Sequence, residues 1–334
     1  MAVSMRDVAQ HAGVSQRTVS NVVNDFVHVR PETRARVLAA IAELGYEPNS
    51  SARSLRTGRT GQIRLLLPDL TSSYFAQLAE YVVTEAERRS LTVLIELTHG
   101  RRENELRGLQ GGGSQRTDGA IIFIAELQAA DFQHRRAEFP VVAVGSSPPT
   151  NEIDSTGLPN YDAALAMVRH LTELRRRRIA IIGTNGLAAR GGAQRYDGYR
   201  AALREAGLPV RAELAAPTAN WSRAEGQRAM AGLLASPARP DAVFAMNDEL
   251  AIGALREALR QGVAVPEEIS VSGFDDIDEA AYTTPPLTTV AVDIRGLAAA
   301  AVELLLRRTF DPEARPRRVV ADFSLQLRES TTSG

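Results

Sequence analysis

The chain has 334 residues, more than one ordinary domain holds, so two or three separate cores are expected. Hydrophobic residues make up 44% of it, charged residues 24% and aromatic residues 5%, which is typical of a globular protein and argues against a disordered or membrane-embedded chain. Cysteine is absent, which excludes disulfides and thiolate chemistry. Neither a secretory signal nor an apolar run of about 18 residues is present, so we expect a cytoplasmic protein without contact to a membrane.

The formal net charge of −1 conceals a basic N-terminal part. The first 60 residues contain eight arginines against five aspartates and glutamates, and the whole chain has no lysine. Such a local imbalance favours binding to phosphate more than the overall charge suggests.

Apolar residues recur at helical spacing over residues 5 to about 48 and predict three short helices. Gly13 suits the end of the first helix and Ser15 is a natural N-cap for the second. Pro31 suits the first position of the third helix, which should stop near Gly45. One core is expected from Val8, Ala9, Val14, Val19, Val22, Val23, Val37, Leu38, Ile41 and Leu44.

The polar stretch 49–61 has the composition of a linker, with a short helix possible from Ser50 to Leu55. From Ile63 onward, buried strands alternate with amphipathic helices in two series, which predicts an α/β fold with two doubly wound lobes of parallel sheet. We expect a three-helix head over 1–48 and a body over 62–334. Within the body, one lobe should span about 62–160 plus 290–320, and the other about 161–289 plus 321–334.

The second helix of the head has the character of a DNA-reading helix. If its valines face the core, polar side chains of types that bind base edges point outward. These residues are Gln16, Arg17, Ser20, Asn21 and Asn24. Taken alone, the pattern also fits a solvated helix face.

Six collinear segments resemble the LacI/GalR family of bacterial transcription repressors, and they run through nearly the whole chain. They are "MRDVAQHAGVSQRTVSNVVND", "RPETRARVLAAIAELGYEPNSSARSL", "PDLTSSYF", "RYDGYRAALREAGLP", "AMNDELAIGALREALRQGVAVPEEISVSGFDD" and "YTTPPLTTV". The resemblance implies a helix-turn-helix head and an effector domain like the periplasmic sugar-binding proteins. It also implies a homodimer on double-stranded operator DNA.

By resemblance, Gln16 and Arg17 are the principal base readers and Asn21 is a third. Asn21 and Arg30 depart from the family's usual residues. Arg30 replaces a capping serine, and we expect it to contact a DNA phosphate instead. The full set expected to contact DNA is Ser15, Gln16, Arg17, Thr18, Ser20, Asn21, Asn24, Arg30, Arg53 and Leu55.

The segment "SARSL" matches a hinge helix that forms on operator DNA in family members. The resemblance makes Leu55 an apolar wedge for the minor groove, with Arg53 beside it at the phosphates. The alternative is that Leu55 packs onto the lobe below.

The resemblance also places a small effector, expected to be a sugar, in the cleft between the lobes. The expected contacts follow strand ends and are Ser72, Ser73, Tyr74, Phe75, Arg195, Trp221, Asn247 and Asp275. Trp221 could stack on a sugar ring or fill a core. Asp248 and Asp276 are interpreted as structural.

An enzyme is the main alternative, and the sequence offers it little. No nucleotide-binding glycine motif, nucleophile elbow or histidine pair at metal-ligand spacing is present. We therefore expect no catalytic residues, no metal and no cofactor. A plain solute-binding protein, the second alternative, does not account for the helix-turn-helix pattern.

Overall fold

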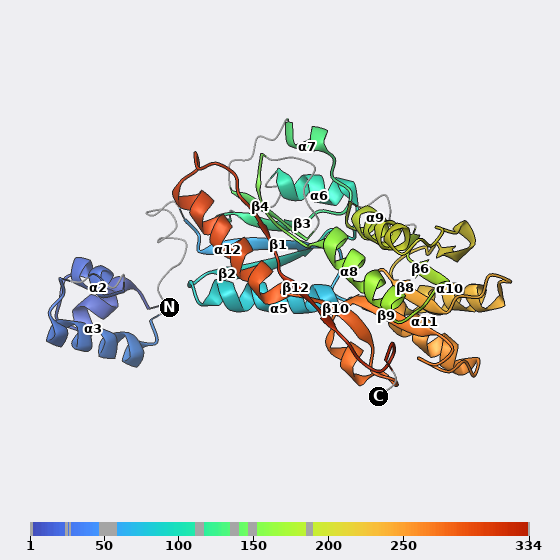
Figure 1. Ribbon diagram of the computed structural model, residues 1–334. Coiled ribbons are helices and arrows are strands. Elements are labelled where there is room, and N and C mark those ends of the chain that lie inside the picture. Colours follow the sequence, from blue (N-terminus) through green and yellow to red (C-terminus); the bar gives the residue numbers. More distant parts are fainter. Residues whose placement is uncertain are drawn as a thin grey trace. The chain divides into compact units, whose positions relative to one another are not determined.

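The computed structural model describes residues 3–23, 26, 28–46, 59–110, 117–133, 140–145, 152–184 and 190–332. It contains two compact units, Met1–Thr60 and Gly61–Gly334, and each is described by itself (Figure 1). No helix in the described ranges is both long and apolar enough to cross a membrane. The predicted hinge segment 50–55 and Asn24 lie outside the described residues.

The first unit consists of α1 (Met5–His11), α2 (Gln16–Val23) and α3 (Pro31–Leu44). The polypeptide turns between α1 and α2 at Gly13, whose φ of 61° is in the left-handed region that glycine adopts without strain. Gly45 ends α3 in the same conformation. The side chains that pack between the three helices are Val8, Ala9, Ala12, Val19, Val22, Val37, Ala40 and Tyr46.

One apolar residue of the predicted head core was assigned wrongly. Leu38 is 50% exposed, because the buried face of α3 passes through its neighbour Val37 and through Ala40. A helical spacing of three or four residues cannot place both Val37 and Leu38 on the same face.

The second unit contains two six-stranded sheets. The first has the order β11-β5-β4-β3-β1-β2, with all pairs parallel. The second has the order β12-β10-β9-β8-β6-β7 and is parallel except for the pair β10–β12. The strands of the first sheet are β1 (Gln62–Leu67), β2 (Thr92–Leu97), β3 (Ala120–Phe123), β4 (Val141–Gly145), β5 (Asp154–Gly157) and β11 (Arg318–Val320). Those of the second are β6 (Ile179–Ile182), β7 (Ala215–Ala216), β8 (Ala242–Ala245), β9 (Ser270–Asp275), β10 (Thr288–Val292) and β12 (Phe323–Gln326).

Helices cover both faces of each sheet (Figure 1). In the first lobe, α5 packs against α12 on one face, and α6 packs on β3 at the other face. In the second lobe, α8 pairs with α9 and α10 pairs with α11. The helices of this unit are α5 (Ser73–Glu87), α6 (Arg102–Leu109), α7 (Ala129–Gln133), α8 (Asn160–Glu173), α9 (Arg190–Glu205), α10 (Arg223–Ala235), α11 (Asp248–Arg260) and α12 (Ile294–Phe310), with short 3-10 turns η2 (Ala212–Leu214) and η3 (Asp278–Tyr282).

The buried run of β1 shows how the two faces are filled. Leu65 and Leu67 join the apolar cluster that includes Leu78 of α5, whereas Leu66 joins the cluster that includes Leu109 of α6. Alternation along a strand sends successive side chains to opposite faces, so a strand covered on both sides is apolar throughout. This confirms the predicted α/β architecture with two doubly wound sheets.

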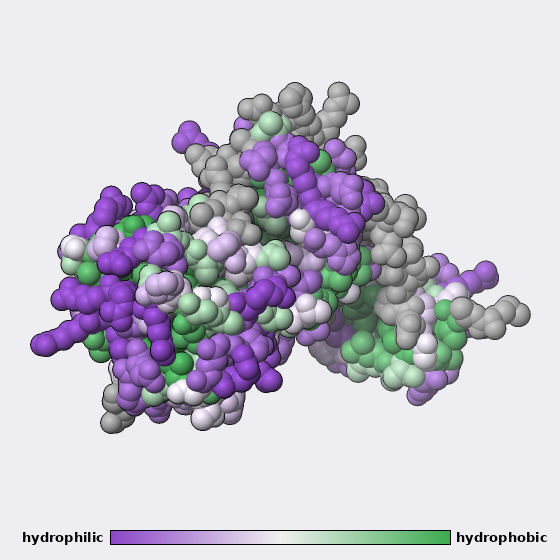
Figure 2. Space-filling view, turned by 90° about the vertical axis from the view of Figure 1, so that its right-hand side faces the viewer, coloured by the Kyte–Doolittle hydropathy of each residue, from purple (hydrophilic) through white to green (hydrophobic). Residues whose placement is uncertain are grey.

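The chain passes between the lobes at three places. It leaves the first sheet after β5 to enter α8, returns after β10 through α12, and crosses again between β11 and β12. The strand β10 pairs with β9 as far as Ala291 and continues to Val292, and the chain then returns to the first lobe. Figure 2 shows hydrophilic side chains around smaller hydrophobic areas on the face it presents.

Candidate DNA-binding surface and ligand cleft

The outer face of α2 presents polar side chains at its N-terminus. Gln16 and Arg17 are exposed, while Ser20 and Asn21 are half-buried. On the opposite face Val19 is fully buried. The helix therefore offers an amide and a guanidinium where a helix-turn-helix protein meets base edges.

Ser15 holds the beginning of this helix. Its Oγ accepts a hydrogen bond from the Thr18 amide at 3.1 Å and lies 2.9 Å from Thr18 Oγ1. Both hydroxyls are thus engaged with each other, which fixes the first turn of the helix. Arg30 is exposed just before α3, and its side chain makes no capping hydrogen bond to that helix. Arg53 and Leu55 lie outside the described residues, as Asn24 does.

A cavity of about 510 Å³ lies between the two lobes. It is formed where strands end. Residues at or just after the ends of β1, β3 and β5 line it from the first lobe, and residues at or after the ends of β6, β7, β8 and β9 line it from the second. In the first sheet β2 lies on one side of β1 and β3 lies on the other, and in the second sheet β7 and β8 flank β6 in the same way. Open α/β sheets bind ligands at such a switch point in strand order. The lining residues are Asp69, Thr71, Ser72, Tyr74, Phe75, Phe123, Ile124, Ala125, Leu158, Gly191, Gly192, Arg195, Asn220, Trp221, Ser222, Asn247, Glu249 and Asp275.

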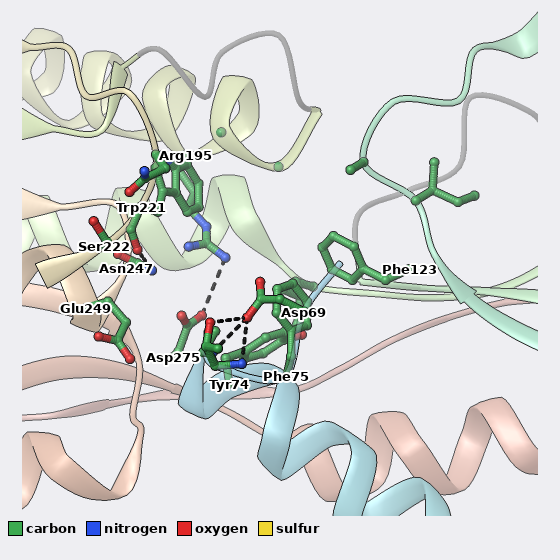
Figure 3. A pocket seen from close by; sticks show the side chains of 18 residues that line it. Asp69, Tyr74, Phe75, Phe123, Arg195, Trp221, Ser222, Asn247, Glu249 and Asp275 are labelled. Carbon is green, nitrogen blue, oxygen red and sulfur yellow. Dashed lines mark hydrogen bonds and ion pairs between the residues drawn. The ribbon is translucent and has the colours of Figure 1, made fainter. Parts of the chain in front are cut away.

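The first lobe contributes an aromatic wall. The rings of Phe75 and Phe123 meet edge to face with centroids 4.9 Å apart, and Tyr74 packs against Phe75 in the same manner. The turn before α5 is fixed by Asp69, whose Oδ1 accepts hydrogen bonds from the amides of Thr71 and Ser72 at 2.8 and 2.9 Å. Figure 3 shows this wall facing Arg195 and Trp221 across the cavity.

Arg195 of α9 is the central cation of the second lobe's wall. Its Nε donates to Asn160 Oδ1 at 2.8 Å, its Nη1 donates to the Met246 carbonyl, and its Nη2 lies 3.7 Å from Asp275 Oδ1. The guanidinium also lies 3.6 Å from the centroid of the Phe274 ring. These contacts fix the guanidinium plane, so its position does not depend on a ligand.

Burial perturbs the ionisable groups of the cleft. It raises the pKa of Asp275 to about 7, although Arg195 opposes the shift and Glu249 adds to it. Burial lowers the pKa of Arg195, and Asp275 opposes that shift. The pKa of Tyr74 is raised by burial, and its buried hydroxyl has no hydrogen-bond partner within the described part of the chain. An unpaired hydroxyl and a carboxyl that titrates near neutrality are features of a binding site.

Asn247 and Trp221 are held by the second lobe's backbone. Asn247 is the N-cap of α11, where its Oδ1 accepts from the Leu250 amide at 2.9 Å, and its Nδ2 donates to the Trp221 carbonyl at 3.2 Å. The indole Nε1 of Trp221 donates to the Gly183 carbonyl at 3.1 Å, and the half-buried ring borders the cavity. Trp221 therefore belongs to the cleft wall.

Seven of the eight residues expected in the cleft line it, and Ser73 does not. The Ser73 hydroxyl instead donates to Glu279 Oε1 at 2.8 Å, because the first turn of α5 directs it away from the neighbouring Tyr74. Asp248 is fully buried and accepts hydrogen bonds from Thr289 and Ile277, and Asp276 pairs with Arg328 at 2.7 Å. Both aspartates thus have structural partners.

Sequence reasoning missed Asp69, Phe123 and Glu249. Asp69 starts the turn after β1, and its spacing from Thr71 and Ser72 is that of an Asx turn, which was a readable signal. Phe123 ends an apolar run that gives no sign of facing a cavity. Within the described ranges, no group of three histidine or acidic side chains could hold a metal ion.

Comparisons with known proteins agree with this arrangement. Residues 4–49 match the bacterial regulatory proteins of the lacI family, and residues 168–331 match a periplasmic binding protein-like domain. The HTH-type transcriptional repressor PurR of Erwinia tasmaniensis is 33% identical over 336 residues, covering 99% of this chain and 97% of that protein.

Two solved structures extend the likeness to the fold. The lac repressor dimer bound to operator and the anti-inducer ONPF is 28% identical with a TM-score of 0.87, and all of both chains is covered. The transcriptional regulator CelR in complex with cellobiose is 28% identical with a TM-score of 0.74, covering 98% of this chain and 99% of that one. Because its relatives are transcriptional regulators over their full lengths, the chain is a regulator and not an enzyme, and it belongs to the lacI family of bacterial DNA-binding proteins.

Proposed function

We propose that this protein is a transcriptional repressor that binds a pseudopalindromic operator as a homodimer and that a neutral sugar in the cleft controls its affinity for DNA. The observation that carries the proposal is the cleft itself, where aromatic rings and fixed polar groups from two lobes face one another. An operator in the bacterial chromosome would place the protein in the cytoplasm.

The exposed end of α2 supports the DNA-binding part. Gln16 and Arg17 project from a helix whose other face is buried, and Ser15 fixes its first turn. Arginine recognises guanine with two hydrogen bonds, and glutamine does the same for adenine. Two such helices in a dimer would read half-sites about one helical turn apart.

Three features of the cleft support a neutral sugar. The rings of Phe75, Phe123 and Trp221 provide faces against which a sugar's C–H groups can pack. Tyr74 and Asp275 supply a hydroxyl and a carboxyl for ligand hydroxyls. Among the described lining residues, three carboxyl side chains face one guanidinium, which disfavours a phosphorylated or otherwise anionic ligand. The three carboxyl groups are those of Asp69, Glu249 and Asp275.

A ligand that contacts both walls would stabilise one relative arrangement of the lobes. Lining residues lie on each side of the cavity, so a ligand makes more contacts when the lobes close around it and fewer when they open. The ligand can shift the DNA-binding equilibrium only by its difference in affinity for the two arrangements. That difference sets whether DNA is released or bound more tightly.

A thermal-shift screen tests the effector class. The purified protein is heated with neutral mono- and disaccharides, phosphorylated sugars and nucleosides at equal concentrations. We expect an increased melting temperature with one or more neutral sugars, and no increase with them in an Asp275→Asn, Tyr74→Phe double variant. Stabilisation by purines or by phosphorylated sugars alone would overturn the neutral-sugar assignment.

In vitro selection of operator DNA, followed by gel shifts, tests the DNA-binding part. Arg17→Ala should cost about 1–3 kcal/mol at one base pair of each half-site and relax the preference there. Arg30→Ala should weaken binding to all sequences equally and reduce the salt slope by about 1 for each phosphate that the protein no longer neutralises. Failure to select a two-fold symmetric sequence would contradict the operator proposal, and an unchanged salt slope would remove the phosphate role of Arg30.

A further inference from the structure

A buried glutamate lies behind the aromatic wall of the cleft. Glu105, in the middle of α6, has no exposed surface. Its Oε1 accepts a hydrogen bond from the Ala125 amide at 3.0 Å. Its Oε2 accepts from the amides of Glu126 and Leu127, each at 3.1 Å. One carboxylate thus holds three consecutive amides of the segment that follows β3.

This segment is part of the cleft. Phe123, Ile124 and Ala125 line the cavity, so Ala125 both borders the ligand space and donates to Glu105. The wall is therefore anchored at its rear by α6, an element that itself does not line the cavity.

The ring of Phe123 is constrained from two further sides. It meets Phe75 with centroids 4.9 Å apart. It also lies over Gly145, where a Cβ atom would come within 2.3 Å of the ring. The ring consequently has little room to move as long as the backbone that follows it stays in place.

A carboxylate buried at this position has a cost in desolvation free energy. Transfer of a carboxyl group from water into a protein interior is unfavourable unless hydrogen bonds compensate it, and an apolar side chain on α6 would avoid the penalty. Burial accordingly raises the pKa of Glu105, and the three amide donors oppose that shift. The arrangement makes sense where a loop must keep one conformation, because the amides after a strand end have no other strand to pair with.

We propose that Glu105 is a positioning residue for the cleft, which fixes the segment 124–127 and through it the orientation of the Phe123 ring. The statement that this wall receives an effector rests on the proposed function. The position of the wall does not depend on the proposed function, so either proposal can be wrong while the other is right.

The test uses the full chain with Glu105→Gln, which keeps size and shape but replaces one of the two acceptor oxygens with an NH₂ group and removes the charge. At least one of the three amides then loses its acceptor. Glu103→Gln is the matched control, since Glu103 is an exposed glutamate of the same helix. Hydrogen exchange is followed for the amides of residues 125–127. We expect exchange about tenfold faster or more in Glu105→Gln and unchanged in the control, since hydrogen bonds to charged groups are the strong ones.

A second readout reports the ring itself. The protein has nine phenylalanines, and labelling with 4-fluorophenylalanine gives each a ¹⁹F resonance. Phe123→Leu identifies the Phe123 signal. In Glu105→Gln this signal should shift or broaden, whereas those of Phe244 and Phe274, buried in the second lobe, should stay the same.

Unchanged exchange at residues 125–127 together with an unchanged Phe123 resonance would overturn the proposal. Faster exchange throughout both lobes, with every ¹⁹F signal altered, would also overturn it, since Glu105 would then support the fold in general. If Glu105→Gln does not fold, Glu105→Asp, which retains the charge on a shorter side chain, is measured in the same way and must show the same local changes.

Discussion

The hydroxyl of Tyr74 is buried at the cleft without a hydrogen-bond partner among the residues that the structure describes. Tyr74→Phe should therefore leave the free energy of unfolding unchanged or slightly raise it, because the substitution removes no hydrogen bond from the folded protein. The same substitution should weaken binding of the sugar selected by the thermal-shift screen by about two- to tenfold, the value of one hydrogen bond. Urea denaturation and calorimetric titration measure the two effects, and a loss of stability of more than about 1 kcal/mol would show that the hydroxyl has a partner in the free protein.

Asp275 should make the stability depend on pH in an unusual direction. Burial raises its pKa from 3.8 to about 7, so between these pH values the folded protein binds more protons than the unfolded chain. The contribution of Asp275 to the free energy of unfolding then falls as the pH rises, by at most about 1.4 kcal/mol per pH unit, and becomes constant above about pH 8. Most acidic side chains that are paired in the folded state act in the opposite direction.

The comparison that isolates this effect is wild type against Asp275→Asn, denatured with urea at several pH values from about 5 to 8. The stability of the wild type relative to the variant should fall across this range. Asp248, whose pKa burial also raises well above its ordinary value, is present in both proteins. Asp275 adds to that shift, so the difference between the two stability curves reports Asp275 together with its effect on Asp248. Parallel stability curves would contradict the raised pKa of Asp275.

At the scale of elements, α10 and α11 approach each other through glycine. A Cβ atom at Gly253 would lie 1.9 Å from the Arg223 carbonyl oxygen, and one at Gly226 would lie 2.1 Å from that of Leu250. Gly253→Ala should therefore lower the free energy of unfolding by about 1–3 kcal/mol, since backbone must move to admit the methyl group.

Gly232 provides the control, because it also lies in α10 but a methyl group there would meet no neighbouring atom within 4 Å. Gly232→Ala should raise the free energy of unfolding by about 0.5–1 kcal/mol through helix propensity. Equal effects of the two substitutions in urea denaturation would mean that the helices do not approach each other closely.

The elements that the sequence predicts well are those whose pattern is set by local rules. Runs such as Leu65–Leu67 are apolar because helices cover both faces of the sheet. The head helices follow local rules too: Ser15 caps the start of α2, Pro31 suits the first position of α3 through its fixed φ, and Gly45 caps the end of α3. The strand β5 has no such pattern, because its residues, Asp154–Gly157, are polar or small. Its burial depends on Arg307 and Arg308 of α12, which pair with Asp154 from across more than 150 residues of chain.

Prediction of the cleft residues from sequence has the same limit, because contacts between distant parts of the chain decide some of them. Strand ends indicated Arg195, Asn247 and Asp275, because open α/β sheets place ligands there whatever the sequence. Which of two neighbours at the start of α5 faces the cavity, Ser73 or Tyr74, depends on the angle at which the helix leaves the sheet. That angle is fixed by packing between α5 and α12, which no local pattern reports.

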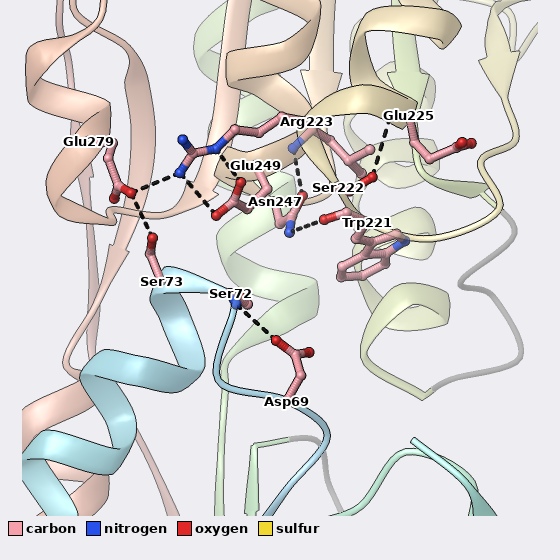
Figure 4. A network of polar contacts seen from close by, with 11 residues as sticks. Asp69, Ser72, Ser73, Trp221, Ser222, Arg223, Glu225, Asn247, Glu249 and Glu279 are labelled. Carbon is pink, nitrogen blue, oxygen red and sulfur yellow. Dashed lines mark hydrogen bonds and ion pairs between the residues drawn. The ribbon is translucent and has the colours of Figure 1, made fainter. Parts of the chain in front are cut away.

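At the scale of the whole molecule, one polar network joins the lobes of the body beside the cleft (Figure 4). Ser73 of the first lobe donates to Glu279 Oε1 at 2.8 Å, and the same oxygen accepts from Arg223 Nη2 of the second lobe at 2.8 Å. Arg223 Nε also donates to Glu249 Oε2 at 2.5 Å, and Glu249 lines the cavity. The ligand space is thus connected through Arg223 to the contact that holds the lobes together.

Glu279→Ala should shift the body toward an open cleft. Because the Glu279 carboxylate is nearly half exposed, water competes for the hydrogen bond from Ser73 that joins the lobes, and we expect the ratio of open to closed forms to rise only about two- to fivefold. The chain offers a clean way to measure this, since it has one tryptophan, Trp221 in the second lobe, and no cysteine. A single Glu103→Cys substitution places a fluorescent acceptor on the first lobe, and energy transfer from Trp221 reports the separation of the lobes.

Asp278→Ala is the matched control, because Asp278 is an exposed acidic residue beside Glu279 in the same turn. Energy transfer should fall in Glu279→Ala and stay at the wild-type value in Asp278→Ala. Ser73→Ala removes the same contact from the first lobe and should reproduce the fall without disturbing the pair of Arg223 with Glu249. If both Glu279→Ala and Ser73→Ala leave the transfer unchanged, the contact only accompanies closure, and the closed arrangement must be held by the aromatic and apolar surfaces of the cleft instead.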